Sequence, residues 1–227
     1  MRRLLPLIAF ALAACSQSAP VPEAPKSQAS ATPAIPADAP VILAFGDSLY
    51  AGYRLAPGEG YPPRLEAALN ASGVKARVVN AGVSGDTTAA ARERLAFTLD
   101  NQRRKPALVM VGLGGNDMLR GLPPAETRAN LDAILAELDK RQIPALLTGM
   151  LAAPNMGKDY VAAFNPIYPA LAAKHKAPLV PFFLQAVIGN DKLMLDDHVH
   201  PNPAGVDKIV AATKDEVAKA LKATTER

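Results

Sequence analysis

This 227-residue chain has little cysteine, little histidine and no long apolar run. Its single cysteine cannot form an internal disulfide. Its three histidines leave few ligands for a catalytic zinc ion, which takes about three from the protein. The apolar run near the N-terminus is shorter than the about 20 residues that a membrane-spanning helix needs. These absences argue against a disulfide-based fold, a metal centre and a multi-span membrane protein.

The charge balance is also unremarkable. The formal net charge is +4, and Arg2 and Arg3 lie in a segment that we expect to be removed, which leaves +2. The other basic residues are scattered and often sit near Asp or Glu, as in residues 207–222. No basic stripe with interleaved aromatic residues is present, so we predict no nucleic-acid partner.

Residues 1–14 have the three-part order of a signal peptide of the lipoprotein type: two arginines, an apolar run over residues 4–12, and small residues. The segment Leu12-Ala13-Ala14-Cys15 resembles the bacterial lipoprotein cleavage box, which implies that Cys15 carries lipid. Because Ser16 replaces the Asp that marks inner-membrane retention, the resemblance favours an exported, periplasmic or outer-membrane lipoprotein with a lipid-anchored N-terminus. The alternative is an ordinary signal peptide beside an incidental cysteine.

Residues 15–40 are predicted to be a tether. Beyond the cysteine they are mostly Ala, Pro and Ser, with Val21 and Ile35 as the large apolar residues, and such a composition cannot bury a core. Its prolines keep the chain extended. We expect the tether to hold one compact domain, residues 41–223, away from a membrane surface.

Apolar runs of strand length recur along that domain, and most are apolar on both faces, as strands of a covered parallel sheet are. They span residues 41–45, 74–79, 107–113, 145–151 and 178–183. Helical stripes occur between and after them, at 131–138 and 206–221. This alternation predicts an α/β fold, a three-layer α/β/α sandwich with a parallel sheet of about five strands.

Glycines and polar residues gather where the apolar runs end, which is where parallel sheets bind ligands. Four such segments span residues 46–49, 80–86, 114–117 and 196–201. The first contains Ser48, and the last contains His200 with Asp197 three residues before it. On one turn that spacing lets Asp197 accept Nδ1–H of His200, which leaves Nε2 free to take a serine proton.

Ser48, His200 and Asp197 are therefore the predicted nucleophile, general base and orienting carboxylate. His175 is expected on an exposed helix end, and neither it nor His198 has a carboxylate three residues upstream. The short motif is weak evidence alone, since a lone histidine before proline is more often structural. Asp196 is the alternative partner for His200.

Three donors are predicted for the oxyanion of an acyl transfer: the N–H of Ser48, the N–H of Gly82 and the side-chain amide of Asn116. Gly82 is a candidate because a residue without Cβ lets a substrate oxygen come close. Gly82 and Asn116 could instead serve only turns and strand exits. Their coincidence with a serine, a histidine and an aspartate at successive strand ends favours one catalytic site.

Taken together, the four segments resemble the GDSL or SGNH hydrolase family in order and spacing. Ser48, Gly82, Asn116 and His200 match its four name-giving residues. Further stretches look like the branch that contains the bacterial periplasmic multifunctional arylesterase, acyl-CoA thioesterase and lysophospholipase; these are residues 84–87, 119–121 and 167–169. The resemblance covers residues 41–221. It implies a flavodoxin-like fold, no metal and no cofactor, and hydrolysis of carboxylic esters and thioesters through an acyl-enzyme on Ser48.

Two positions depart from the family pattern. Tyr50 stands where a small polar residue is expected, and His198 stands where glycine is usual. Both are expected near the mouth of the site, where they would affect acyl-chain preference. We expect the acyl pocket in the loops after Leu151 and around residues 182–184, although those apolar residues could equally serve the core.

The sequence is also compatible with other functions. A metal hydrolase could use the cluster of Asp196, Asp197, His198 and His200, but no His or Cys elsewhere supplies a further ligand. A non-catalytic flavodoxin-like module could bind a lipid or a cofactor. The same chemistry could also remove acetyl groups from carbohydrate or peptidoglycan.

Overall fold

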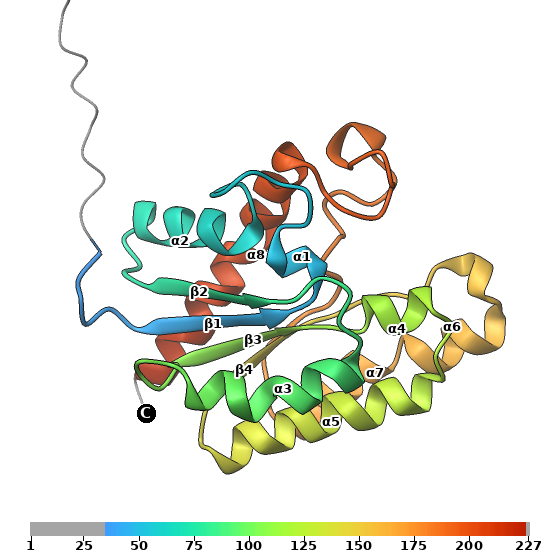
Figure 1. Ribbon diagram of the computed structural model, residues 1–227, viewed down its shortest axis with the longest axis horizontal. Helices are drawn as coiled ribbons and strands as arrows, with labels where there is room; N and C mark the ends of the chain where they lie inside the picture. The colour runs from blue at the N-terminus through green and yellow to red at the C-terminus, as the bar shows by residue number, and fades with distance from the viewer. Residues whose placement is uncertain (1–34, 226–227) are drawn as a thin grey trace, which may run out of the picture. The chain divides into compact units, whose positions relative to one another are not determined.

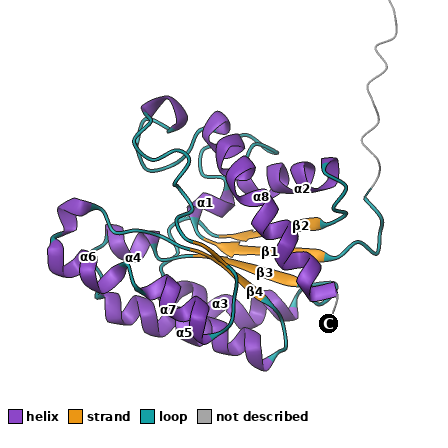
Figure 2. Ribbon diagram, turned by 180° about the vertical axis from the view of Figure 1, so that it is seen from behind, coloured by secondary structure: helices purple, strands orange, loops and turns teal. Residues whose placement is uncertain are grey.

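The computed structural model describes residues 35–225, which form an α/β/α sandwich around a parallel sheet, as predicted (Figures 1 and 2). The strands, in the order β2-β1-β3-β4-β5, pair in parallel throughout. Their bounds are β1 Val41–Gly46, β2 Arg77–Gly82, β3 Leu108–Gly112, β4 Ala145–Thr148 and β5 Leu179–Val180. The order changes direction at β1, so the carboxyl ends of β1 and β3 flank the point where such sheets bind ligands.

Helices cover both faces of the sheet (Figures 1 and 2). One face carries α2 (Tyr61–Ala71) and α8 (Pro203–Thr225), and the other carries α3 (Thr88–Asp100), α5 (Pro124–Lys140) and α7 (Ile167–Lys174). Short helices follow strand ends and loops: α1 (Ser48–Ala51), α4 (Gly115–Leu119), α6 (Lys158–Phe164), and the 3-10 turns η1 (Pro154–Met156) and η2 (Asp191–Leu193). The short helices thus build the end of the molecule where the strands finish.

The central strands form the core because both of their faces are covered. Neighbouring residues of a strand point to opposite faces, and both Ile42 and Leu43 of β1 and both Val109 and Met110 of β3 are completely buried. Full burial of such a side chain stabilises the fold by about 1.5–3 kcal/mol relative to leaving it exposed. The expectation of strands apolar on both faces therefore holds for β1 and β3.

The edge strand β2 differs from the prediction in position and in exposure. It begins at Arg77 rather than at residue 74, because the Val74 N–H donates to the Leu69 carbonyl at 3.0 Å and closes the end of α2. All six of its residues are exposed or half-buried. The carboxylate of Glu66 accepts the Val78 N–H at 2.7 Å, which occupies a donor of the free edge.

Tyr50 is a core residue, so the expectation that it lies near the site mouth is wrong. Its ring is fully buried and stacks on Tyr61 with centroids 5.4 Å apart. Its hydroxyl lies 2.8 Å from Thr148 Oγ1, and burial raises its pKa well above the usual range. A Cβ on Gly46 or Gly112 would come within 2.6 Å of this side chain, so the tyrosine requires glycine at both strand ends.

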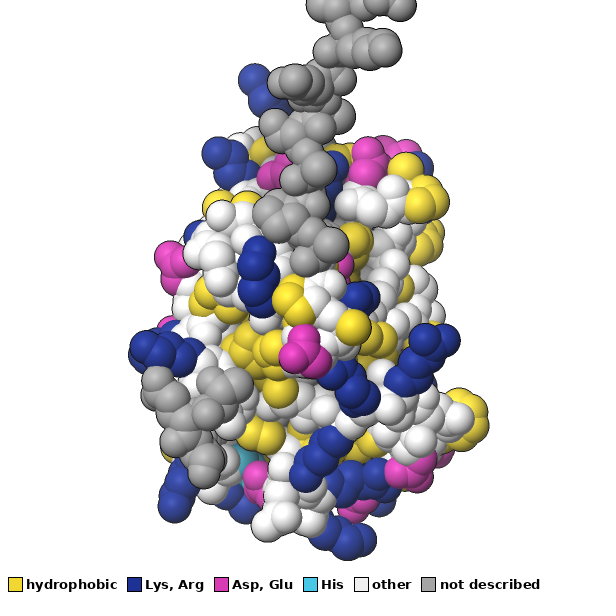
Figure 3. All heavy atoms as spheres, turned by 90° about the vertical axis from the view of Figure 1, so that its left-hand side faces the viewer, with side chains coloured by type: hydrophobic (Ala, Val, Ile, Leu, Met, Phe, Trp, Pro, Cys, Tyr) yellow, Lys and Arg dark blue, Asp and Glu magenta, His cyan; other side chains and the backbone are white. Residues whose placement is uncertain are grey.

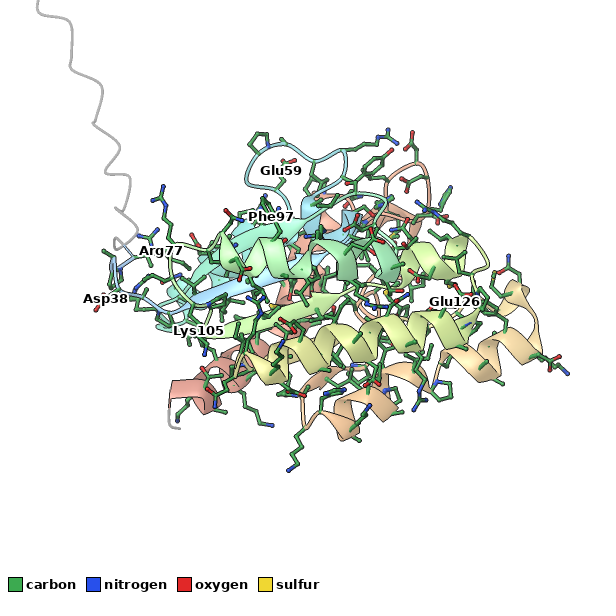
Figure 4. All side chains as sticks on the ribbon, turned by 60° about the horizontal axis from the view of Figure 1, so that its bottom comes forward. Asp38, Glu59, Arg77, Phe97, Lys105 and Glu126 are labelled. Atoms are coloured by element: carbon green, nitrogen blue, oxygen red, sulfur yellow. The ribbon has the colours of Figure 1, made fainter. Side chains whose placement is uncertain are left out.

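The end of the domain where the strands begin carries mixed charge. Figure 4 shows Asp38, Arg77 and Lys105 at that end, with Phe97 projecting from α3. On the same face, Lys and Arg side chains are interspersed with Asp, Glu and apolar residues (Figure 3). Within residues 35–225, no helix has both the length and the apolar character to cross a membrane.

Candidate active site

Ser48 stands directly beyond the carboxyl end of the central strand β1. The chain turns at Asp47, whose side chain caps α1 by accepting the Leu49 N–H at 3.0 Å. Ser48 is the first residue of that helix, so its own N–H has no helical acceptor. The local sequence therefore presents both the hydroxyl and the N–H of Ser48 at the sheet end.

His200 and Asp197 come from the loop before α8 and reach Ser48 across the sheet end. Asp197 Oδ1 accepts the N–H groups of Val199 and His200, both at 2.9 Å, which folds the loop into a turn. Asp197 Oδ2 lies 2.8 Å from His200 Nδ1, and His200 Nε2 lies 2.8 Å from Ser48 Oγ. The structure thus brings the three residues into one row.

The charge of Asp197 is held by this turn. Partial burial alone would raise the pKa of Asp197, but the N–H groups of His200 and Val199 and the His200 ring lower it to about 2. Asp196 points elsewhere: it forms a two-point ion pair with Arg54, at 2.5 and 3.2 Å, and is largely exposed. The row therefore contains Asp197 and excludes the alternative partner.

Asn116 reaches the site from α4, which follows β3. The turn into α4 needs Gly114, whose φ of 103° is left-handed and whose Cβ would come 2.2 Å from Tyr168 Oη. Asn116 lines the same cavity as Ser48. Its Nδ2 donates one hydrogen to the Asp86 carbonyl at 3.0 Å, which leaves the second hydrogen for another acceptor.

Gly82 does not belong to the site, so its assignment as an oxyanion donor is wrong. Its N–H donates to Asn80 Oδ1 at 2.9 Å, and it is not among the residues that line the cavity. A Cβ at Gly82 would come 2.4 Å from the backbone N of Ala51. The close approach that calls for glycine here is therefore the packing of α1 against β2.

Gly85 is the glycine that lies at the cavity, and the sequence reasoning missed it. Its φ is 87°, and it lines the cavity together with Ser48 and Asn116. Within the part of the chain that the structure describes, neither its N–H nor that of Ser48 donates to a protein acceptor. The signal was present in Ser84-Gly85-Asp86-Thr87, where a glycine stands in a turn beyond the strand rather than at the strand's last residue.

The row opens into one large, mostly apolar cavity of about 1120 Å³. Leu151, Phe182 and Leu184 line it, as expected, whereas Phe183 packs edge-on against Tyr50 in the core. The remaining apolar lining comes mainly from α1, α4, α6 and the loops after β4 and β5: Leu49, Tyr53, Met118, Leu119, Met150, Ala152, Ala153, Pro154, Val161, Ala162, Ile188 and Val199. The row of Ser48, His200 and Asp197 therefore faces an apolar cavity that is large enough for an acyl chain.

His198 lines the cavity as expected, with a φ of 54° at a position where glycine would be unstrained. Its Nδ1 lies 3.2 Å from Asp191 on η2, and the pair is exposed. The ring of Tyr53 lies against that of His200, with centroids 4.5 Å apart. In residues 35–225 no three His, Cys, Asp or Glu side chains are grouped so as to hold a metal ion.

This fold and this row of serine, histidine and aspartate at its strand ends define an α/β serine hydrolase. The chain belongs to the GDSL-like Lipase/Acylhydrolase family, whose model matches residues 44–208. It is an ester hydrolase of that family.

Several relatives share most of the chain. Esterase TesA of Pseudomonas aeruginosa is 40% identical over 174 residues, which cover 77% of this chain and 86% of that protein. Thioesterase 1/protease 1/lysophospholipase L1 of Escherichia coli K12 is 39% identical over 166 residues, 73% of this chain and 77% of that one. The crystal structure of AlinE4, an SGNH-hydrolase family esterase, is 58% identical with a TM-score of 0.70 and covers 81% of this chain and 97% of its own.

Proposed function

We propose that this esterase works through an acyl-enzyme on Ser48. His200 Nε2 removes the hydroxyl proton as Ser48 Oγ attacks the acyl carbonyl, and Asp197 stabilises the imidazolium that forms. His200 then gives the proton to the leaving alcohol. Water, deprotonated by His200, cleaves the acyl-enzyme and restores the serine. The supporting observation is the row of two 2.8 Å contacts that ends at the Ser48 hydroxyl, a group of a residue that lines the cavity.

The developing oxyanion is held by the N–H groups of Ser48 and Gly85 and by the side-chain amide of Asn116. The residues that carry these groups line one cavity, and within residues 35–225 the two backbone N–H groups donate to no other protein group. A preorganised donor of this kind contributes about 3–4 kcal/mol to the transition state.

The favoured substrates are carboxylic esters with an extended apolar acyl chain. An acetyl group would leave most of a cavity of about 1120 Å³ unfilled, which disfavours a carbohydrate or peptidoglycan O-acetyl esterase. Relatives named arylesterase and lysophospholipase L1 are, by those names, hydrolases of carboxylic esters. If the protein is exported, coenzyme A thioesters are scarce around it, so esters and membrane-derived lipids are the natural candidates.

Replacing the nucleophile tests the mechanism. Ser48→Ala should lower kcat on p-nitrophenyl butyrate by about 10⁴-fold or more, because no other group can form the acyl-enzyme. Equal melting temperatures for variant and wild type would show that the fold is intact. A folded Ser48→Ala variant that retains the wild-type rate would refute the proposal.

Export and lipid attachment at Cys15 complete the proposal. Cys15, the signal peptide and the tether up to residue 34 lie outside the described residues. Cys15→Ser should abolish incorporation of radiolabelled palmitate and move the protein from the membrane pellet to the soluble fraction, with Ser16→Ala as the matched control. Unchanged labelling of Cys15→Ser would rule out this lipid anchor.

A further inference from the structure

Arg94 of α3 is a mostly buried cation that contacts the loop after β2 and the end of β1 without lining the cavity. Its Nε donates to Asp86 Oδ2 at 2.6 Å, and its Nη2 donates to the Gly46 carbonyl at 3.0 Å. Its guanidinium lies 4.2 Å from the centroid of the Phe45 ring. Only 21% of the Arg94 side chain and 12% of the Asp86 side chain are exposed, so the pair is not an ordinary surface ion pair.

Asp86 connects this arginine to the oxyanion donors. The Asp86 carbonyl accepts Nδ2 of Asn116 at 3.0 Å, and Asp86 directly follows Gly85. The main chain of Asp86 therefore holds the Asn116 amide, while the side chain of Asp86 is held by Arg94. A displacement of Asp86 would move both the amide of Asn116 and the N–H of Gly85.

Gly46 connects the same arginine to the nucleophile. Gly46 is the last residue of β1 and precedes the turn at Asp47 and Ser48. Its carbonyl accepts the Val83 N–H at 3.0 Å as well as the Arg94 guanidinium. The end of β1 and the loop after β2 are therefore joined at one acceptor.

Arg94 also balances the charge behind the site. The carboxylates of Asp86 and Asp117 both bear on the buried Asp47, next to the nucleophile. Without the guanidinium, the mostly buried Asp86 carboxylate would lose its ion pair with Arg94, and its negative charge would oppose the one that develops on the substrate. The cation therefore favours the transition state as well as the loop geometry.

We propose that Arg94 is a positioning residue of the oxyanion hole, which it sets by holding Asp86, and through it Asn116, against the end of β1. This inference rests on the proposed function, in which Asn116 is an oxyanion donor. Because Arg94 does not reach the cavity, it acts on the transition state and not on substrate binding.

The first test is a kinetic comparison on p-nitrophenyl butyrate. Arg94→Met should lower kcat by about 10- to 100-fold, as small displacements of catalytic groups do, and change KM less than about twofold. Arg94→Lys keeps the charge but cannot span both acceptors, so it should recover part of kcat. Arg92→Met is the matched control, because Arg92 is an exposed residue of the same helix that bonds to Asn130. It should leave both constants unchanged.

A double-mutant cycle separates positioning from general destabilisation. In an Asn116→Ala background, Arg94→Met should cost far less than it does in the wild type, because the amide it positions is gone. The same loss in both backgrounds, or a wild-type kcat in folded Arg94→Met, would overturn the inference. If Asn116→Ala alone leaves kcat unchanged, the oxyanion proposal itself has failed, which is a distinguishable result.

Discussion

At the residue scale, the most unusual setting belongs to Asp47, next to the nucleophile. Its side chain is buried, and its Oδ1 accepts the Leu49 N–H at 3.0 Å. Burial, with smaller contributions from the charges of Asp86 and Asp117, raises its pKa to about 7 against the hydrogen bond from Leu49. The Asp47 carboxylate therefore caps α1, but burial of its ionised form lowers the stability of the fold.

That cost has a defined pH dependence. The folded pKa of Asp47 lies above the unfolded value, so the folded state binds its proton more tightly, and stability falls as pH rises from about 4 through about 7. Asp47→Asn keeps an acceptor for the Leu49 N–H and cannot ionise. The free energy of unfolding of the variant minus that of wild type, measured with urea, should therefore increase by about 4 kcal/mol from pH 4 to pH 8.

The control for this measurement is Asp215→Asn, which changes a carboxylate that is 90% exposed. Its difference from wild type should stay flat over the same pH range. A flat difference for Asp47→Asn as well would show that the buried carboxyl is not the group that titrates.

At the scale of secondary structure, His175 joins two helices. It lies just after α7, its side chain is only 7% exposed, and its Nδ1 and Nε2 lie 2.6 Å from Asp139 and 2.7 Å from Asp132 of α5. The expectation of an exposed helix end was therefore wrong. Its partners come from a helix more than thirty residues earlier in the chain, which sequence spacing could not reveal.

The protonated form is the one that can donate to both carboxylates. Burial alone would lower the pKa of His175, but Asp139 and Asp132 raise it above the usual range. A raised pKa in the folded state means that this stabilisation is complete below pH about 6.5 and is lost as pH rises through the folded pKa. His175→Gln should therefore be less stable than wild type at pH 5.5, with the gap closing toward pH 9 in thermal melts.

His198→Gln is a suitable control, because His198 is exposed and its ring contacts Asp191 rather than Asp132 or Asp139. Its melting temperature should follow the wild-type pH profile. A gap between His175→Gln and wild type that stays constant with pH would assign His175 a packing role only.

At the scale of the whole molecule, the cavity is assembled from segments that lie far apart in the sequence. Ala162 lines it from α6, whereas Ala163, its neighbour on the same helix, does not. Ala162→Trp should add bulk to the cavity and lower kcat/KM for p-nitrophenyl octanoate by about 10-fold, with acetate little affected. Ala163→Trp should leave the chain-length profile unchanged. Equal losses on both esters would place the acyl chain elsewhere.

Much of this architecture follows from the sequence alone. Strands β1 and β3 were predicted because a strand covered on both faces must be apolar throughout, and the pairing of Asp197 with His200 was predicted because it lies within one turn. Ser48 was found because the nucleophile follows the first strand directly. These features depend on local spacing and on burial, which the order of residues carries.

The tertiary structure decided which group of a strand-end segment faces the cavity. Gly82 is the last residue of β2, and Gly85 lies in the turn beyond it. The packing of α1 on β2 keeps Gly82 away from the cavity, whereas Gly85 lines it. Tyr50 entered the core for the same kind of reason, since its ring fits over two strand-end glycines. Contacts between segments that lie far apart in the sequence set these orientations, so the spacing of the two glycines along the chain could not decide between them.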